Sequence, residues 1–144
     1  MIAEAYWGSE PELQALGFDY TYDKVVYDFL AARDDSGLQD YLKDKGTGYL
    51  ERCVVFLENH DEPRAWKIFP EAAEHRRIAE RLFSLPGAKL IHEGQMEGAR
   101  LRVPVQLARR PAERSNELSC SMYKEILFRR KQQEALRTGT QLWG

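Results

Sequence analysis

The sequence predicts an α/β protein in which parallel strands alternate with helices. Short apolar segments alternate along the chain with segments whose apolar residues recur every three or four positions, which is the pattern of βαβ units. The run at residues 53–57 is uninterrupted by polar residues, as is typical of a parallel strand buried on both faces. Polar side chains follow the better-defined strands, where the sites of such proteins lie.

The strands are expected at residues 2–7, 18–22, 53–57 and 88–91. Between the first two, Ser9 and Glu12 form a capping box that opens a short helix, and Gly17 closes it. A second helix begins at Asp23, and a third follows a break at residues 34–37. The apolar stripe at residues 72–83 predicts a fourth helix, and a last amphipathic helix runs from about residue 118 to a cap near Gly139.

Composition limits the partners and the location. The 144 residues suffice for one domain, and 21 basic against 23 acidic residues leave a net charge of −2 without a basic block, which argues against nucleic acid. No apolar stretch is long enough for a membrane span and no secretory signal is seen, so we expect a cytoplasmic protein without a membrane partner. Cys53 and Cys120 are expected to be free thiols, and no cofactor is predicted.

Three polar clusters end the predicted strands, and parallel strands would bring them to one edge of the sheet. They are Glu4 with Tyr6 and Trp7, then Asn59-His60-Asp61, then His92-Glu93-Gly94-Gln95. Carboxylates and imidazoles that converge suggest a polar ligand, and the faces of Tyr6 and Trp7 suit the stacking of a sugar ring.

Other interpretations of these residues stay open. The segment 59–61 also fits an ordinary turn before a helix, and His92 fits a solvated loop. Four residues, His60, Asp61, His92 and Glu93, could instead hold the metal ion of a metal-dependent hydrolase, although the spacing of known zinc motifs is absent. His75, among charged neighbours, is expected at the surface.

Three segments resemble the α-amylase family of glycoside hydrolases. Residues 2–8 and 56–61 resemble two catalytic-strand motifs of that family, in the same order, and residues 85–95 resemble the last barrel strand and its loop. The resemblance implies half of a TIM-type (β/α)8 barrel, with strands five to eight and their helices in residues 1–137. It also implies that residues 138–144 start a C-terminal β-domain.

The resemblance also implies roles. Glu4 would be the general acid/base, Asp61 the carboxylate that stabilises the transition state, and His60, Asn59, Tyr6 and Trp7 the residues that contact the sugar. The intact protein would hydrolyse or transfer α-linked glucosides of starch or oligosaccharides with retention. Arg64 also follows the motif, as in some relatives, but a solvated Arg64 paired with Glu58 or Glu62 is equally compatible.

In this family the nucleophile is an Asp on strand four, which would precede this sequence, so the chain alone is expected to be inactive. A half barrel would also leave strand edges open. We therefore expect the N-terminal half as a separate polypeptide, self-association of two copies, or an origin within a longer reading frame. The alternative function is a non-catalytic carbohydrate-binding or regulatory half-barrel.

Overall fold

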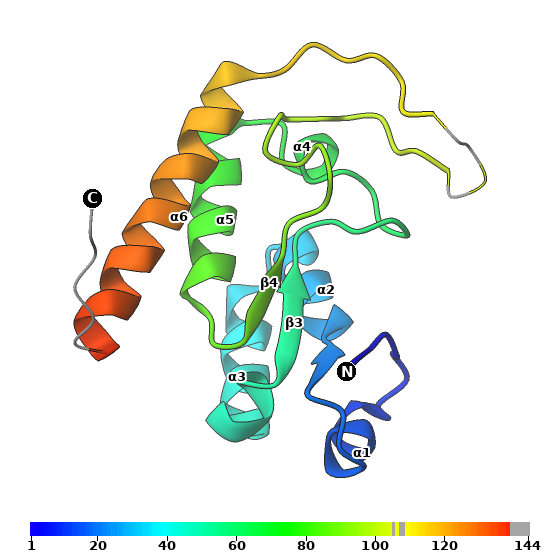
Figure 1. The fold of residues 1–144 in the computed structure, drawn as a ribbon, viewed down its shortest axis with the longest axis vertical. Helices are drawn as coiled ribbons and strands as arrows, with labels where there is room; N and C mark the ends of the chain where they lie inside the picture. The colour runs from blue at the N-terminus through cyan, green and yellow to red at the C-terminus, as the bar shows by residue number, and fades with distance from the viewer. Residues whose placement is uncertain (105, 107–108, 139–144) are drawn as a thin grey trace.

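The computed structural model describes residues 1–104, 106 and 109–138, and it confirms the α/β class with parallel strands (Figure 1). The four strands form one sheet in the order β1-β2-β3-β4, and every neighbouring pair is parallel. This arrangement is compatible with part of a (β/α)8 barrel. The elements are β1 (Ile2–Ala3), α1 (Glu10–Ala15), β2 (Tyr20–Tyr22), α2 (Lys24–Ala32), α3 (Asp35–Leu50), β3 (Cys53–Phe56), α4 (Ala65–Ile68), α5 (Ala72–Ser84), β4 (Ala88–Leu90) and α6 (Glu117–Thr138).

All four strands lie where the sequence predicts them but are shorter: β1, β3 and β4 end earlier than predicted, and β2 begins two residues later. β1 stops at Ala3 instead of residue 7, and the chain bends further along, where Trp7 and Gly8 both have positive φ angles, 61° and 79°. The residues after Ala3 therefore form a loop at the carboxyl end of the sheet. β2, β3 and β4 each differ from the predicted range by one or two residues.

The helix starts show which capping predictions hold. Ser9 does precede α1, but its side chain makes no capping bond, since its backbone is itself helical rather than extended. The second helix begins at Lys24, one residue after Asp23, and the Asp23 carboxylate caps it by accepting from the Val26 amide at 3.1 Å. The predicted break at residues 34–37 is wrong in extent: Asp34 alone lies outside the helix, accepts from the Gly37 amide and caps α3.

The core lies between the sheet and the helices on one of its faces. β3 is entirely buried, and its Cys53 and Val55 pack with apolar residues of α2, α3, α5 and α6 in one cluster. Because side chains alternate along a strand, Phe56 points to the opposite face. There it packs against the rings of Tyr22 and Tyr27, at centroid distances of 5.7 and 5.5 Å.

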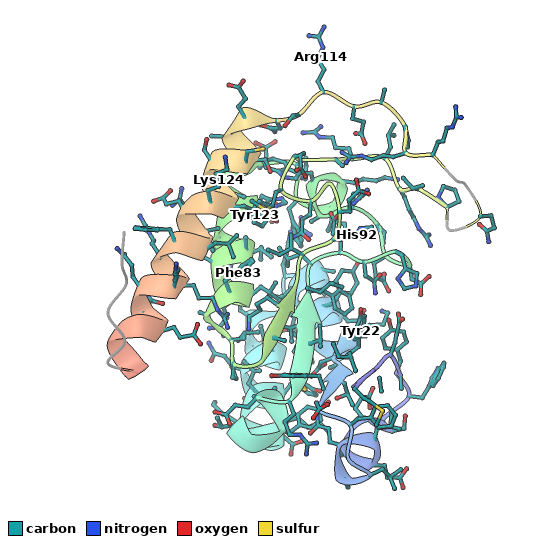
Figure 2. The ribbon with its side chains drawn as sticks, in the orientation of Figure 1. Tyr22, Phe83, His92, Arg114, Tyr123 and Lys124 are labelled. Atoms are coloured by element: carbon teal, nitrogen blue, oxygen red, sulfur yellow. The ribbon has the colours of Figure 1, made fainter. Side chains whose placement is uncertain are left out.

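His75 corrects the sequence analysis, which placed it at the surface. It is fully buried in α5, its ring stacks on Trp66 with centroids 4.1 Å apart, and its Nε2 lies 2.8 Å from the Tyr123 hydroxyl. Figure 2 shows Tyr123 on α6 beside α5. Burial lowers the pKa of His75 to about 4. The imidazole is thus a neutral core group that joins α4, α5 and α6.

A tight turn before β4 and a long loop after it complete the fold. Gly87 begins the approach of β4 to β3 with φ 79°, and a Cβ there would lie 2.5 Å from the carbonyl oxygens of Leu50 and Cys53. The segment between β4 and α6 contains no helix or strand among its described residues and extends well beyond the sheet (Figure 1). The outgoing and returning parts of this loop are linked by the Glu113 carboxylate, which accepts from the backbone amides of Arg100 and Leu101.

Other predictions are settled only in part. Cys53 and Cys120 are free, as expected. Among the described residues, no helix has the length and apolar character needed to cross a lipid bilayer. The expected cap at Gly139 and the expected β-domain fall beyond Thr138, where α6 ends, and so lie outside the described residues.

Candidate active site

Two carboxylates and one imidazole meet at the carboxyl end of the sheet. Glu4 follows β1 directly, while His60 and Asp61 follow β3. The Nε2 atom of His60 lies 3.8 Å from Oε1 of Glu4 and 3.5 Å from Oδ2 of Asp61. Their side chains are 37% (Glu4), 44% (His60) and 53% (Asp61) exposed, so a ligand in solvent can reach them.

The structure therefore brings together the three residues to which the sequence analysis gave the main roles. One ligand atom from each lies within 4.8 Å of the others. Carboxylate oxygens and an imidazole nitrogen are also atoms that can hold a divalent cation. Within the described residues this is the single group of three or more such side chains close enough to do so.

Tyr6 and Asn59 connect this cluster to the protein interior. The Tyr6 hydroxyl donates to Oε1 of Glu4 at 2.8 Å and accepts from Nδ2 of Asn59 at 3.4 Å. Burial raises the pKa of Tyr6, and the nearby carboxylate of Glu4 raises it further. The phenol consequently stays protonated and holds one oxygen of Glu4 in place.

Asn59 also shapes the turn that carries His60 and Asp61. It is buried, and its Oδ1 accepts from the backbone amides of Asp61 at 2.9 Å and Glu62 at 2.8 Å. An asparagine that bonds the backbone two residues on mimics a turn and holds it in one conformation. The turn interpretation of residues 59–61 is thus correct, and it also serves to present the two site side chains.

Trp7 lies beside the cluster with its ring open to solvent. It is 91% exposed, the most exposed of the large apolar side chains described, and it meets Tyr6 edge to face at a centroid distance of 6.2 Å. Its positive φ angle turns the ring outward at the bend after β1. An indole face in this position is available for stacking by a flat ligand surface.

The third polar cluster does not join the first two. Glu93 is largely exposed and pairs with Arg110 at 2.9 Å. His92 turns its Nδ1 toward Arg64, at 2.9 Å, and lies beyond the tip of β4 (Figure 2). Burial and the neighbouring guanidinium of Arg64 lower the pKa of His92. The four-residue metal site suggested above, with His92 and Glu93, is therefore wrong.

Arg64, like His75, is buried where its sequence context suggests solvent. It does pair with Glu58, at 2.6 Å, but neither is solvated: Arg64 is 1% exposed and Glu58 is fully buried. Glu58 continues the apolar run of β3 without a break, which is the sequence signal that it lies inside the protein. A buried carboxylate needs a buried partner, and Arg64 supplies it.

Two α-amylases of known structure are similar to this chain. A noncanonical maltogenic α-amylase from Thermotoga neapolitana is 27% identical, with a TM-score of 0.62 over 90% of this chain. An α-amylase from H. orenii is 23% identical, with a TM-score of 0.56 over 72% of this chain, which shows the fold alone. No model of a known protein family and no curated protein matches the sequence.

The chain covers 32% and 24% of those two structures, so it spans about a third of their length or less. A fragment of an α-amylase-family protein would give this coverage. The resemblance that the three sequence motifs indicated is confirmed, with a partial TIM-barrel-like fold of the glycoside hydrolase type.

Proposed function

From this similarity we propose that residues 1–137 are the C-terminal half of an α-amylase-like barrel, strands five to eight with their helices. We further propose that the protein containing them cleaves or transfers α-linked glucosides with retention of configuration. The observation that carries the proposal is the meeting of Glu4, His60 and Asp61 at the ends of two parallel strands. Both similar solved structures are α-amylases, which supports an α-linked glucan as the class of substrate.

Glu4 is the general acid/base in this proposal. Its Oε1 already accepts from Tyr6 and faces His60, whereas no bond to Oε2 is seen among the described residues. Oε2 is therefore the atom that can hand a proton to the glycosidic oxygen and later take one from water. A general acid or base of this kind contributes about 10²- to 10⁴-fold to the rate.

Asp61 and His60 complete the arrangement around the sugar. As the anomeric carbon gains positive charge, a fixed carboxylate nearby stabilises it, and Asp61 is held by the turn that Asn59 builds. His60 lies between the two carboxylates and can donate to a sugar hydroxyl. Trp7 supplies the face on which a glucose ring stacks.

A retaining mechanism also needs a nucleophilic carboxylate about 5 to 5.5 Å from the acid. Within the described residues, the carboxylate grouped with Glu4 is Asp61, to which we give another role. We propose that the nucleophile comes from a part of the protein beyond this chain. The chain itself should then bind sugar without hydrolysing it.

Binding to the chain can be measured by calorimetry with maltotetraose. We expect saturable binding that weakens about tenfold in Trp7→Ala, which corresponds to about 1.4 kcal/mol of lost stacking. Phe128→Ala is the matched control, because Phe128 is another exposed aromatic residue but lies on α6. A folded chain that shows no saturable binding of maltotetraose contradicts the proposal.

Catalysis is tested in the longest protein that contains this chain. There, Glu4→Gln should lower the release of reducing sugar about 10²- to 10⁴-fold while maltotetraose still binds. Binding without hydrolysis in that protein would select the second candidate, a non-catalytic carbohydrate-binding half-barrel. The exposed ring of Trp7 favours this candidate as well.

The two edges of the sheet indicate where a partner would bind. β1 and β4 are the outer strands, each paired on one side within the described residues. Met1, just before β1, and Ile2, the first residue of β1, are 74% and 61% exposed. Unpaired strands with apolar side chains recruit other strands. We propose that the other half of a barrel, or a second copy of this chain, covers these edges.

A further inference from the structure

The buried guanidinium of Arg64 gathers groups from three separate segments. Its Nη1 lies 2.6 Å from Oε1 of Glu58, 2.9 Å from Nδ1 of His92 and 2.7 Å from the carbonyl oxygen of Glu93. Its Nε donates to the carbonyl oxygen of Leu101 at 3.2 Å. Burying a charge of this kind costs several kcal/mol unless its partners are well placed. The arrangement therefore depends on all three segments being in position.

Glu58 and Arg64 also bracket the turn of the candidate site. Glu58 precedes Asn59, and its second oxygen, Oε2, accepts from the backbone amide of Ala65 at 2.6 Å, where α4 starts. The ion pair thus closes a loop whose two ends are both buried and whose middle carries His60 and Asp61. Neither end of the turn can move without breaking a buried, charged hydrogen bond.

The long loop after β4 then contacts the same turn twice, through consecutive residues. The Leu101 carbonyl is bound by Arg64 at the base of the turn. The next residue, Arg102, donates from Nε to the carbonyl oxygen of His60 at 3.3 Å, near the tip of the turn. The base and the tip of the turn are therefore both hydrogen-bonded to the same short piece of the loop, residues 101 and 102.

We propose that Arg64 is a positioning residue: with Glu58 it forms a buried staple that sets where His60 and Asp61 lie, and through Leu101 it locks the long loop onto the site. Arg64 touches no ligand in this scheme and acts through the turn. The statement rests on the proposed function only in assuming that His60 and Asp61 contact the sugar. The placement of His60 can be tested without any sugar.

The chain has three histidines, which makes imidazole NMR spectra a direct readout. His60 reports on the site, His92 on the staple, and buried His75 on the core between α5 and α6. Arg64→Lys keeps the charge but loses the planar fork that serves several acceptors. Glu58→Gln keeps the shape but removes the countercharge.

We expect either variant to shift the His60 and His92 ring signals, leave those of His75 unchanged, and weaken maltotetraose binding about tenfold. Arg129→Met is the matched control, because it removes an exposed ion pair with Glu125 on α6 and should shift neither His60 nor His92. His60 signals and sugar affinity like those of the unmodified chain in both staple variants would overturn the proposal.

A variant on the loop keeps the test decisive if the buried substitutions prevent folding. Arg102→Gln alters an exposed side chain and should still shift His60 while sparing His75. Unchanged His60 signals in Arg102→Gln would overturn the locking of the loop onto the site. If the unmodified chain binds no maltotetraose yet His60 responds as described, the proposed function fails and the staple stands.

Discussion

The buried His75 predicts an acid-sensitive fold. Its pKa is lowered from 6.5 to about 4, because burial favours the neutral ring. Between these two pH values the unfolded chain binds the proton and the folded chain does not, so the free energy of unfolding falls as the pH falls. A shift of this size corresponds to about 3 kcal/mol lost between pH 7 and pH 4, with no further loss from this group below about pH 4.

The measurement is urea denaturation at several pH values from 7 to 4, at one fixed protein concentration. Carboxylates also titrate in this range, so the unmodified chain is compared with His75→Gln, which cannot titrate but can still bond the Tyr123 hydroxyl. From pH 7 to pH 4, the free energy of unfolding of the unmodified chain should fall by about 3 kcal/mol more than that of His75→Gln. His60→Gln, at a half-exposed position, is the control and should retain the acid sensitivity.

The reasoning would be refuted by a flat difference between the unmodified chain and His75→Gln across this pH range, with both proteins folded at pH 7. That result would mean that the imidazole is charged inside the protein or reaches solvent there. Direct titration of the His75 ring by NMR decides which of the two holds.

Further predictions concern the turn, the sheet edge and the thiols. Asn59→Ala should lower the free energy of unfolding by about 1–3 kcal/mol, because two backbone amides lose their acceptor, and urea denaturation measures it; an unchanged midpoint contradicts this. In sedimentation velocity the chain should self-associate as its concentration rises, and Ile2→Lys should reduce this while Leu118→Lys does not; a monomer at every concentration argues against open edges. Burial, together with a nearby carboxylate, raises the pKa of the Cys53 thiol to about 12, so Ellman's reagent should label Cys120 alone until the protein is denatured.

The sequence was sufficient for features that local patterns determine. The parallel class followed from the apolar run of β3 and the alternation of elements, and the meeting of Glu4 with His60 and Asp61 followed from strand direction. The short helix α4 was not predicted, because four residues are too few to show a helical period.

The two main errors involve burial that depends on distant partners. Arg64 is buried because acceptors at residues 93 and 101 surround it, and no local pattern reveals them. The charged residues next to His75 suggest a surface position, whereas its spacing indicates burial. It lies three, four and seven residues before Ile78, Ala79 and Leu82, which is the spacing of one buried helical face.

The tight turn at Gly87 has a consequence for how variation in this protein should be interpreted. Any side chain there would strike two backbone oxygens, and the positive φ disfavours it independently. Natural variants and mutant libraries should thus retain glycine at this position even where sugar chemistry has been lost. Invariance at residue 87 would report on how two strands meet, and not on selection for an enzyme.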